Sequence, residues 1–511
     1  MRRRLNELRA QTSVLPPETL STISQYACAL QLMVDEDDPH LPVVLGTIST
    51  RWRKVVYSTP SLWMHLIVTL ENAQCTSHAN LTLLQLYFEN SGNQSISIRI
   101  NLIDDESEYE NDESKHEDDE NLNKTTSSVC VREILKCIFK DHPTKLRAFF
   151  CDTFFFEWLP PFFPNVDANV GFPNLKRIHI GWAGLSPILA SRGNADLFPL
   201  RASTTPRLNY ISLMNCLPAI QIPHEQITVL ILEDIRIDKC FKLLFLRPNL
   251  VDYHCKYPRS PRHSDGGPTD QHMTLSHLKC FGWAFSFETW DLALLTLLAL
   301  PVLEHFRCEN QKSGTGWGSE ASSEDSNDLT QVSNLRRHLR GFFSRSPKLA
   351  TFEGASKGTG SWVIREPCDY LPDSTEEVYL QGTTHVEAES CMWKLGCRSQ
   401  DSGPPAALPR LKVLSLEGKF WLNPSGYFFH LLIMMLQLRR QGPPEERGDQ
   451  PWLESLTLKH DMKTSPLLGT GSSEYLAELQ NFVDGGLELV TTDRRGRDRP
   501  ERFRCEDSIY Y

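Results

Sequence analysis

The sequence predicts an α/β protein. A small N-terminal bundle of three helices precedes a long array of irregular repeats, whose short strands stack in a curved parallel sheet. Two observations give this prediction. Apolar residues recur at helical spacing between residues 13 and 68, and from Leu146 onward a short strand-like phrase returns along the chain. A chain of 511 residues is too long for one compact unit, so parts of different architecture are expected.

The N-terminal bundle is predicted from three apolar-periodic segments. The residues LPPETLSTISQYACAL place Leu20 and Ile23 on one helical face. Residues 41–56 have the spacing of one amphipathic helix of about four turns. Thr59 and Pro60 suit the N-cap and first residue of a third helix. The expected core of the bundle is Leu45, Ile48, Trp52, Leu62 and Trp63. The two tryptophans would lock the second and third helices together.

At these residues the chain resembles the F-box-like proteins that are abundant in mushroom-forming fungi. The shared landmarks are Leu15-Pro16-Pro17-Glu18, Leu20-Ser21-Thr22-Ile23, the stretch DEDDPH, Leu45-Gly46-Thr47-Ile48 through Trp52-Arg53, and Ser58-Thr59-Pro60-Ser61-Leu62-Trp63. The resemblance implies an F-box-like domain over residues 13–68 that binds the Skp-type adaptor of a cullin-RING ubiquitin ligase. Adaptor contact would fall to exposed residues of the first helix: Leu15, Pro16, Glu18, Leu20 and Ile23.

Repeats follow the bundle. A helix at 81–92 precedes a strand with alternating isoleucines, and 131–141 again has helical spacing. The phrase L-x-x-φ-x-φ, in which φ is apolar or cysteine, then starts at Leu146, Leu175, Leu208, Ile227, Leu250, Leu278, Leu303, Leu349, Thr375, Leu411 and Leu453. Several copies follow a proline by one or two residues, which signals a helix stop. The spacing fits leucine-rich repeats with insertions, so we expect a solenoid over residues 81–490.

Each predicted strand presents alternate side chains to the concave face of this solenoid. The candidates are Arg177, His179, Tyr210, Asp252, His254, His305, Arg307, Glu353, Tyr379, Glu417 and Lys459. Mixed charge with histidine and tyrosine favours recognition of a protein over tracking of phosphates. We therefore expect an unidentified target protein to bind here, with an ordinary solvated surface as the alternative.

Charge and composition exclude several classes. The run from Asp104 to Glu120 carries net charge −10 of the formal −11, which leaves a nearly neutral body and no electrostatic argument for nucleic acid. We expect a disordered acidic insertion over 104–127, a basic helix or extension over 1–12 and an arginine-rich tail over 491–511. Apolar runs fall short of the roughly 18 residues of a membrane span. The fourteen scattered cysteines indicate free thiols in the cytoplasm or nucleus, and we expect no metal and no cofactor.

One catalytic motif matches the chain. Residues 354–358 read G-x-S-x-G, with Ser356 as a possible nucleophile, but KGTGSWV is a poor start for the helix that this motif needs. The expected function is therefore a non-catalytic substrate receptor of an SCF-type ubiquitin ligase. A leucine-rich-repeat scaffold without ligase association is the alternative, and a serine hydrolase using Ser356 is a remote one.

Overall fold

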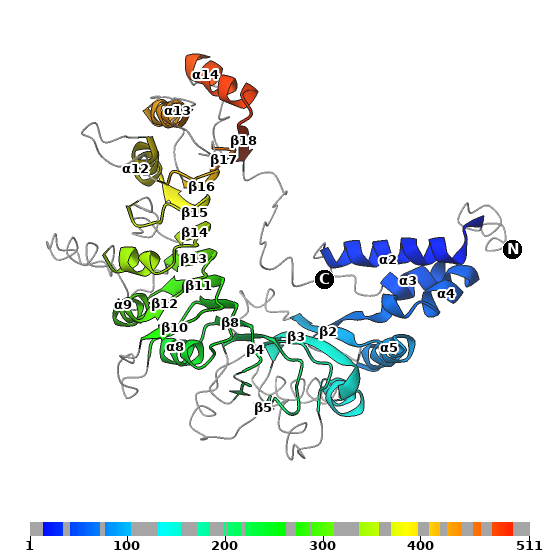
Figure 1. Cartoon of the computed structure of the whole chain (residues 1–511). Coiled ribbons are helices and arrows are strands. Elements are labelled where there is room, and N and C mark those ends of the chain that lie inside the picture. Colours follow the sequence, from blue (N-terminus) through cyan, green and yellow to red (C-terminus); the bar gives the residue numbers. More distant parts are fainter. Residues whose placement is uncertain are drawn as a thin grey trace, which may run out of the picture. The chain divides into compact units, whose positions relative to one another are not determined.

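The computed structural model describes residues 14–33, 41–71, 77–103, 131, 133–154, 171–182, 198–200, 202–215, 220–223, 225–261, 272–286, 288–310, 337–356, 369–396, 408–419, 427–440, 453–460 and 473–493. It is an α/β structure with a large parallel sheet (Figure 1). The chain forms two compact units that divide between Ile227 and Thr228. The predicted segments 1–12 and 104–127, and the tail beyond Asp493, lie outside the described residues.

The first unit begins with α2 (Pro17–Met33), α3 (Leu41–Ile48), α4 (Thr50–Tyr57) and the 3-10 turn η2 (Pro60–Trp63). The prediction of one helix over 41–56 was wrong, because the chain breaks at Ser49. The Ser49 hydroxyl accepts a hydrogen bond from the backbone N–H of Trp52 at 3.2 Å and so caps α4. The predicted third helix is a single turn. Thr59 and Pro60 do begin it, as expected.

Trp63 is the centre of the packing in this region. Its side chain is fully buried, and its indole N–H donates to the Val56 carbonyl at 2.9 Å. Its ring meets Tyr57 and Tyr87 edge to face, each with a centroid distance of 5.0 Å. Because Tyr87 belongs to α5 (Ser77–Asn90), the N-terminal helices share their core with the first helix of the strand-containing part.

Parallel strands recur through the rest of both units. In the first unit the order is β1 (His65–Glu71), β2 (Ile96–Ile103), β3 (Leu146–Phe154), β4 (Arg177–Trp182) and β6 (Tyr210–Met214). In the second unit it is β8 (Val229–Glu233), β9 (Asp252–Lys256), β11 (Cys280–Phe285), β13 (His305–Asn310), β14 (Thr351–Ser356), β15 (Glu377–Thr384), β16 (Val413–Lys419), β17 (Ser455–His460) and β18 (Glu488–Asp493). Two short parallel pairs join β5 (Phe198–Pro199) to β7 (Ile220–Gln221) and β10 (Met273–Thr274) to β12 (Leu298–Ala299). All eleven phrases coincide with a strand of the large sheet, so these strand predictions are confirmed.

A recurring turn leads into these strands. The N–H of Leu250 donates to the carbonyl of Arg247, three residues earlier, and the same bond recurs at the leucines that open other phrases. Pro248 occupies the second position of its turn, where a fixed φ near −65° is favourable. The leucine that ends the turn is fully buried. The prolines before the phrases therefore shape the turn into each strand, in addition to stopping a preceding helix.

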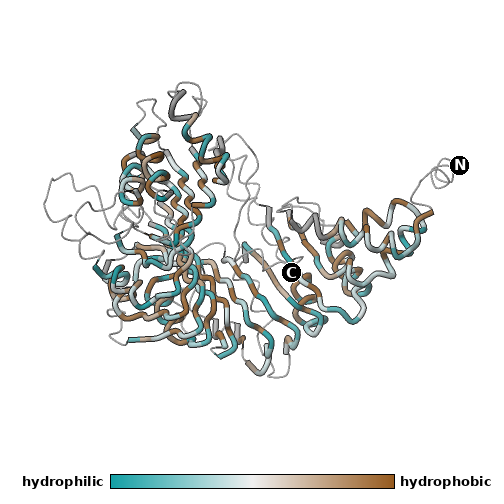
Figure 2. The backbone as a smooth tube through the Cα atoms, turned by 45° about the horizontal axis from the view of Figure 1, so that its top comes forward, coloured by the Kyte–Doolittle hydropathy of each residue, from teal (hydrophilic) through white to brown (hydrophobic). Residues whose placement is uncertain are grey.

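Helices cover one face of the sheet in the second unit (Figure 1). They are α8 (Ile237–Phe245), α9 (Glu288–Leu297), the helical segment 337–344, α12 (His385–Gly396), α13 (Tyr427–Arg440) and α14 (Ser473–Asp484). The φ side chains of the strands pack against them: Phe306 and Phe352 meet Phe343 at ring-centroid distances of 5.2 and 6.5 Å. Polar and apolar residues alternate along the strands (Figure 2), so the side chains between the φ positions point to the opposite face, here called the open face.

Candidate functional site

Exposed apolar side chains gather on the first two helices. Ile23 and Tyr26 on α2 are 42% and 69% exposed, and Val44 and Ile48 on α3 are also exposed. Each pair is three or four residues apart and so lies on one side of its helix. We call these four residues the helical surface. Exposed apolar pairs on neighbouring helices are candidates for contact with another protein.

The predicted adaptor contacts are placed unevenly. Pro16, Glu18 and Ile23 are exposed, whereas Leu15 is half-buried, with its carbonyl accepting a hydrogen bond from Arg51. Leu20 is fully buried, so its prediction as an exposed contact was wrong. Leu20 and the buried Ser24 form the inward side of α2, which turns Ile23 and Tyr26 outward.

The predicted core of the N-terminal helices holds at four of five positions. Those that are buried are Leu45, Trp52, Leu62 and Trp63. Ile48 was wrongly predicted, because 55% of its surface is exposed. Ile48 is the last residue of α3, and α4 begins after the break at Ser49. Ile48 and Trp52 therefore do not lie on one face of a continuous helix.

The open face of the second unit brings several predicted residues together. Arg307, Glu353 and Tyr379 are register partners on the neighbouring strands β13, β14 and β15. His305 belongs to the adjacent row, beside Thr351 and Glu377. Register partners point to the same side of a sheet, so these side chains form one continuous polar cluster.

Most polar groups of this cluster are paired. His254 Nε2 lies 2.8 Å from Asp252 Oδ1 on β9, and Arg307 donates to Glu309 Oε1 through two nitrogens at 2.8 and 3.1 Å. The Tyr379 hydroxyl donates to Glu377 Oε2 at 3.2 Å. The hydrogen bonds of Arg307 and Tyr379 hold these two side chains in fixed positions along their own strands.

Glu353 occupies the middle of the cluster. Burial raises the pKa of this carboxyl above its ordinary value, and the negative charge of Glu377 adds to the rise. Arg307, His254 and His305 oppose it. Because desolvation is the largest of these effects, Arg307 and the two histidines do not fully offset the cost of ionising Glu353.

Two further predicted residues lie on the same face, away from the cluster. Glu417 on β16 and Lys459 on β17 are register partners, so opposite charges stand side by side there. The sequence placed both residues on this face, but their pairing depends on the register between strands.

The open face of the first unit holds the other three predicted residues. Arg177 and Tyr210 are register partners on β4 and β6, and Tyr210 is buried. His179 lies 2.7 Å from Asp152 Oδ1 and 2.8 Å from Ser212 Oγ, and it lowers the pKa of the Asp152 carboxyl. With only 5% of its surface exposed, Ser212 is out of reach of a substrate. The array instead ties β3, β4 and β6 together.

Ser356 is the last residue of β14. Residues 357–368, where a nucleophile elbow would need its helix, lie outside the described residues. Across the described ranges, no three histidine, cysteine or carboxylate side chains converge as metal ligands.

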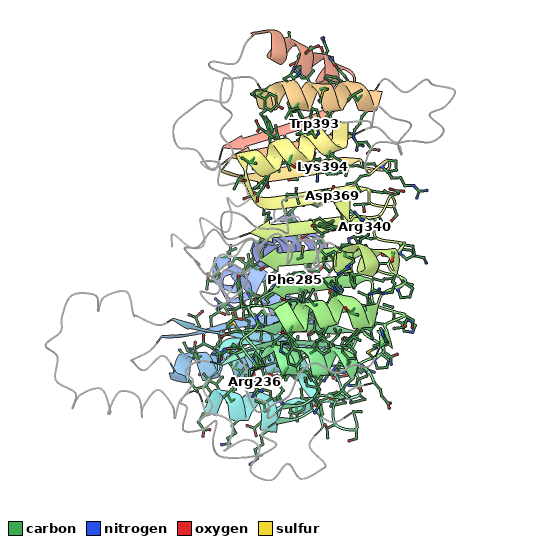
Figure 3. All side chains as sticks on the ribbon, turned by 90° about the vertical axis from the view of Figure 1, so that its left-hand side faces the viewer. Arg236, Phe285, Arg340, Asp369, Trp393 and Lys394 are labelled. Carbon is green, nitrogen blue, oxygen red and sulfur yellow. The ribbon has the colours of Figure 1, made fainter. Side chains whose placement is uncertain are left out.

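The helix side of the second unit carries its own polar contacts. The Lys394 ammonium of α12 lies 2.6 Å from Asp369 Oδ2, and Arg340 donates to the Asp369 carbonyl at 2.8 Å (Figure 3). Trp393, next to Lys394, is 51% exposed. This exposed tryptophan was not among the predicted site residues.

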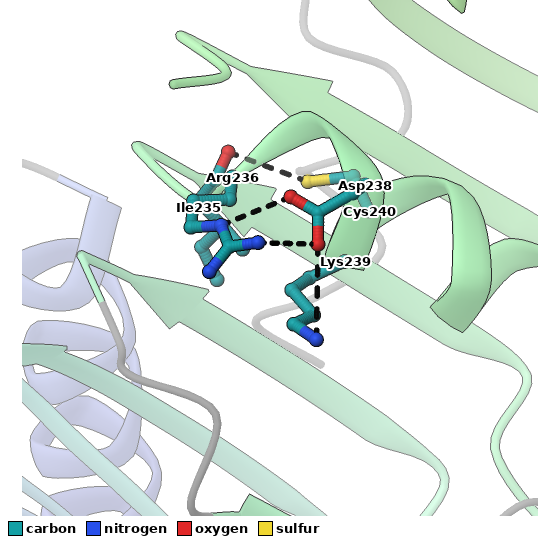
Figure 4. A network of polar contacts seen from close by, with 5 residues as sticks. All are labelled: Ile235, Arg236, Asp238, Lys239 and Cys240. Atoms are coloured by element: carbon teal, nitrogen blue, oxygen red, sulfur yellow. Dashed lines mark hydrogen bonds and ion pairs between the residues drawn. The ribbon is translucent and has the colours of Figure 1, made fainter. Parts of the chain in front are cut away.

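A local polar network holds the start of α8. Arg236 donates to both carboxylate oxygens of Asp238, at 3.0 and 2.8 Å (Figure 4). The Cys240 thiol points back to the Ile235 carbonyl at 3.6 Å. Asp238 lies in the first turn, where its negative charge interacts favourably with the positive end of the helix dipole. The network therefore stabilises the start of the helix.

No family model and no curated protein matches the sequence. The resemblance of residues 13–68 to F-box-like proteins therefore depends on the quoted residues alone. Among the helices of the described ranges, none has both the length and the apolar composition that crossing a bilayer requires.

Proposed function

We propose that the protein is the substrate-receptor subunit of an SCF-type cullin-RING ubiquitin ligase. In this proposal an F-box-like domain over residues 13–68 binds the Skp-type adaptor, and a leucine-rich-repeat-like solenoid recruits the target protein. The helical surface is the observation that carries the proposal. It lies on the segment with the F-box-like landmarks and exposes Ile23 and Tyr26 on one helix.

The packing beneath the helical surface supports this role. Trp52 and Trp63 are buried, and Trp63 packs against Tyr57 of α4. The Ser21 hydroxyl lies 3.2 Å from that of Thr59, which links α2 to the start of η2. A surface on fixed helices loses little conformational freedom on binding, which favours affinity. Tyrosine is also among the side chains enriched in protein interfaces.

The open face supports the second half of the proposal. Its charged and aromatic side chains are held by short-range pairs, a composition that suits a polar, specific interface. A receptor of this kind needs no catalytic group. It would raise the effective concentration of its target near a ubiquitin-loaded enzyme held elsewhere in the complex.

A leucine-rich-repeat scaffold without ligase association is the second candidate. The parallel strands and their polar face favour it independently of the helical surface. The two candidates differ only in whether the adaptor binds.

Co-purification of the full chain with a Skp-type adaptor tests the proposal. The full chain is needed because a fragment ending before α5 would lose Tyr87, against which Trp63 packs. Ile23→Asp with Tyr26→Asp should abolish binding while circular dichroism stays unchanged, because both side chains are exposed. Trp393→Asp, at an exposed aromatic of the second unit, is the matched control and should bind normally. A folded wild-type chain that fails to bind the adaptor would favour the scaffold.

A further inference from the structure

We propose that the open face over β9, β13, β14 and β15 binds a basic segment of the target protein, with a lysine or arginine side chain seated between Glu353 and Glu377. This inference deepens the proposed function, since it rests on the open face being the target-binding surface. It names the chemistry of the partner, which the family resemblance leaves open.

The charge on this face favours a cationic partner. Three rows of register partners run across the open face of the second unit. Their acidic members are Glu233, Asp252, Glu309, Glu353, Glu377, Glu417 and Glu488, and their basic members are Lys256, Arg307 and Lys459. Seven carboxylates against three cations leave an excess of four negative charges while the histidines are neutral.

Glu353 and Glu377 lie on the neighbouring strands β14 and β15, in adjacent rows of this face. Arg307, the cation in the row of Glu353, is already bound to Glu309. Glu377 lies on the next strand and raises the cost of ionising Glu353. A cationic side chain placed between the two carboxylates would relieve this repulsion, which gives the site a preference for lysine or arginine.

Hydrogen bonds from neighbouring residues order one of the two carboxylates before a ligand binds. Thr351 and Tyr379 both donate hydrogen bonds to Glu377 Oε2, at 3.3 and 3.2 Å, and fix that carboxylate in place. Tyr379 stands in the row of Glu353, so an aromatic residue lies beside the site, of the kind that a guanidinium or a lysine stem can pack against. Ordered groups of this kind reduce the entropy lost on binding.

Fluorescence anisotropy of the full chain with a short fluorescent oligolysine peptide tests the proposal. Glu353→Gln with Glu377→Gln should weaken binding by about tenfold, because two partly exposed charge pairs are lost. Because oligolysine also binds the acidic run of residues 104–120, whose net charge is −10, all proteins are compared with the acids of that run replaced by Asn and Gln. The matched control is Asp373→Asn with Asp484→Asn, which removes the same charge from exposed sites of the second unit and should change binding far less. Equal losses in the two variants, or no loss in the first, would overturn the proposal. So would tighter binding of an oligoglutamate peptide.

The same variants separate this inference from the ligase proposal. Glu353→Gln with Glu377→Gln should bind the adaptor as the wild type does, since both residues lie in the second unit. If the Glu353→Gln, Glu377→Gln variant bound oligolysine as tightly as the wild type, and the wild type bound the adaptor, the inference alone would be wrong. If this variant alone bound oligolysine more weakly, and the wild type did not bind the adaptor, the ligase proposal would be wrong and the inference would stand.

Discussion

The imidazole of His254 occupies the space that a side chain at Gly282 would fill. A Cβ built on Gly282 would lie 2.1 Å from His254 Nδ1, well inside any real contact. The two residues are register partners on β9 and β11, so the ring leans across β11 toward Arg307 on β13. A glycine at this position thus allows the ring and the backbone of the next strand to approach closely.

Gly282→Ala should displace the His254 ring and separate it from Asp252. The imidazole can rotate away, so we expect a loss of about 1 kcal/mol in the free energy of unfolding, at the low end for overpacking. Chemical denaturation measures the loss, and the NMR chemical shifts of the His254 ring report its new surroundings. Gly341→Ala is the control, because a Cβ there meets nothing closer than 3.8 Å and alanine favours a helix. An unshifted His254 signal in Gly282→Ala would contradict this account of the contact.

Glu353→Gln should stabilise the protein at neutral pH. The pKa of Glu353 is raised in the folded state, so folding is favoured while this group is protonated. That contribution is complete below the unfolded pKa and is lost as the pH rises through the folded pKa. The gain in melting temperature over the wild type should therefore grow from about pH 4 to pH 7. Glu377→Gln, which weakens the bonds from Thr351 and Tyr379, should give no such gain. A melting temperature of Glu353→Gln below that of the wild type at pH 7 would refute the argument.

Trp63→Ala should lower the free energy of unfolding by about 3–5 kcal/mol, since a fully buried indole is removed. Trp63→Phe keeps most of the packing on Tyr57 and Tyr87 but loses the bond to the Val56 carbonyl, and should cost about 1–2 kcal/mol. Trp393→Ala, at a half-exposed site, should stay within about 0.5 kcal/mol of the wild type. Denaturant unfolding of the three variants measures these losses. An equal loss in the free energy of unfolding for Trp63→Ala and Trp393→Ala would contradict the described packing.

Ser49→Ala should destabilise the protein by about 1 kcal/mol, because the N–H of Trp52 loses its capping acceptor. Ser49→Asp should retain most of the stability, since its carboxylate caps the same N–H and opposes the helix dipole. Thermal unfolding of the two variants gives the comparison. Equal melting temperatures for the two would mean that the cap contributes nothing.

The strands were predictable because each copy of the phrase L-x-x-φ-x-φ contains the burial pattern of one strand. A buried leucine closes the turn, and the φ residues face the helices. Strands β1 and β18 were missed because neither carries that phrase. In β1 a signal was present, since Leu66, Val68 and Leu70 alternate with less buried residues, but it lies directly after a helical segment.

The site was less predictable than the fold. Both sides of α2 carry apolar residues, so periodicity alone could not show that Leu20 faces inward and that Ile23 and Tyr26 face outward. The break at Ser49, which exposes Ile48, depends on a local side-chain bond. On the open face, alternation gave the correct side of each strand. The meeting of Glu353 with Arg307 and Tyr379 needs the register between strands, which no single strand encodes.

Hydrogen–deuterium exchange of the full chain, with and without the Skp-type adaptor, tests the central claim most directly. The account predicts slower exchange on adaptor binding in the helices between Pro17 and Tyr57, around the helical surface. Strands β9 to β15 should exchange at unchanged rates, because the open face stays available for a target. No protection in α2 and α3 under saturating adaptor, or protection confined to the open face, would contradict the proposed receptor function.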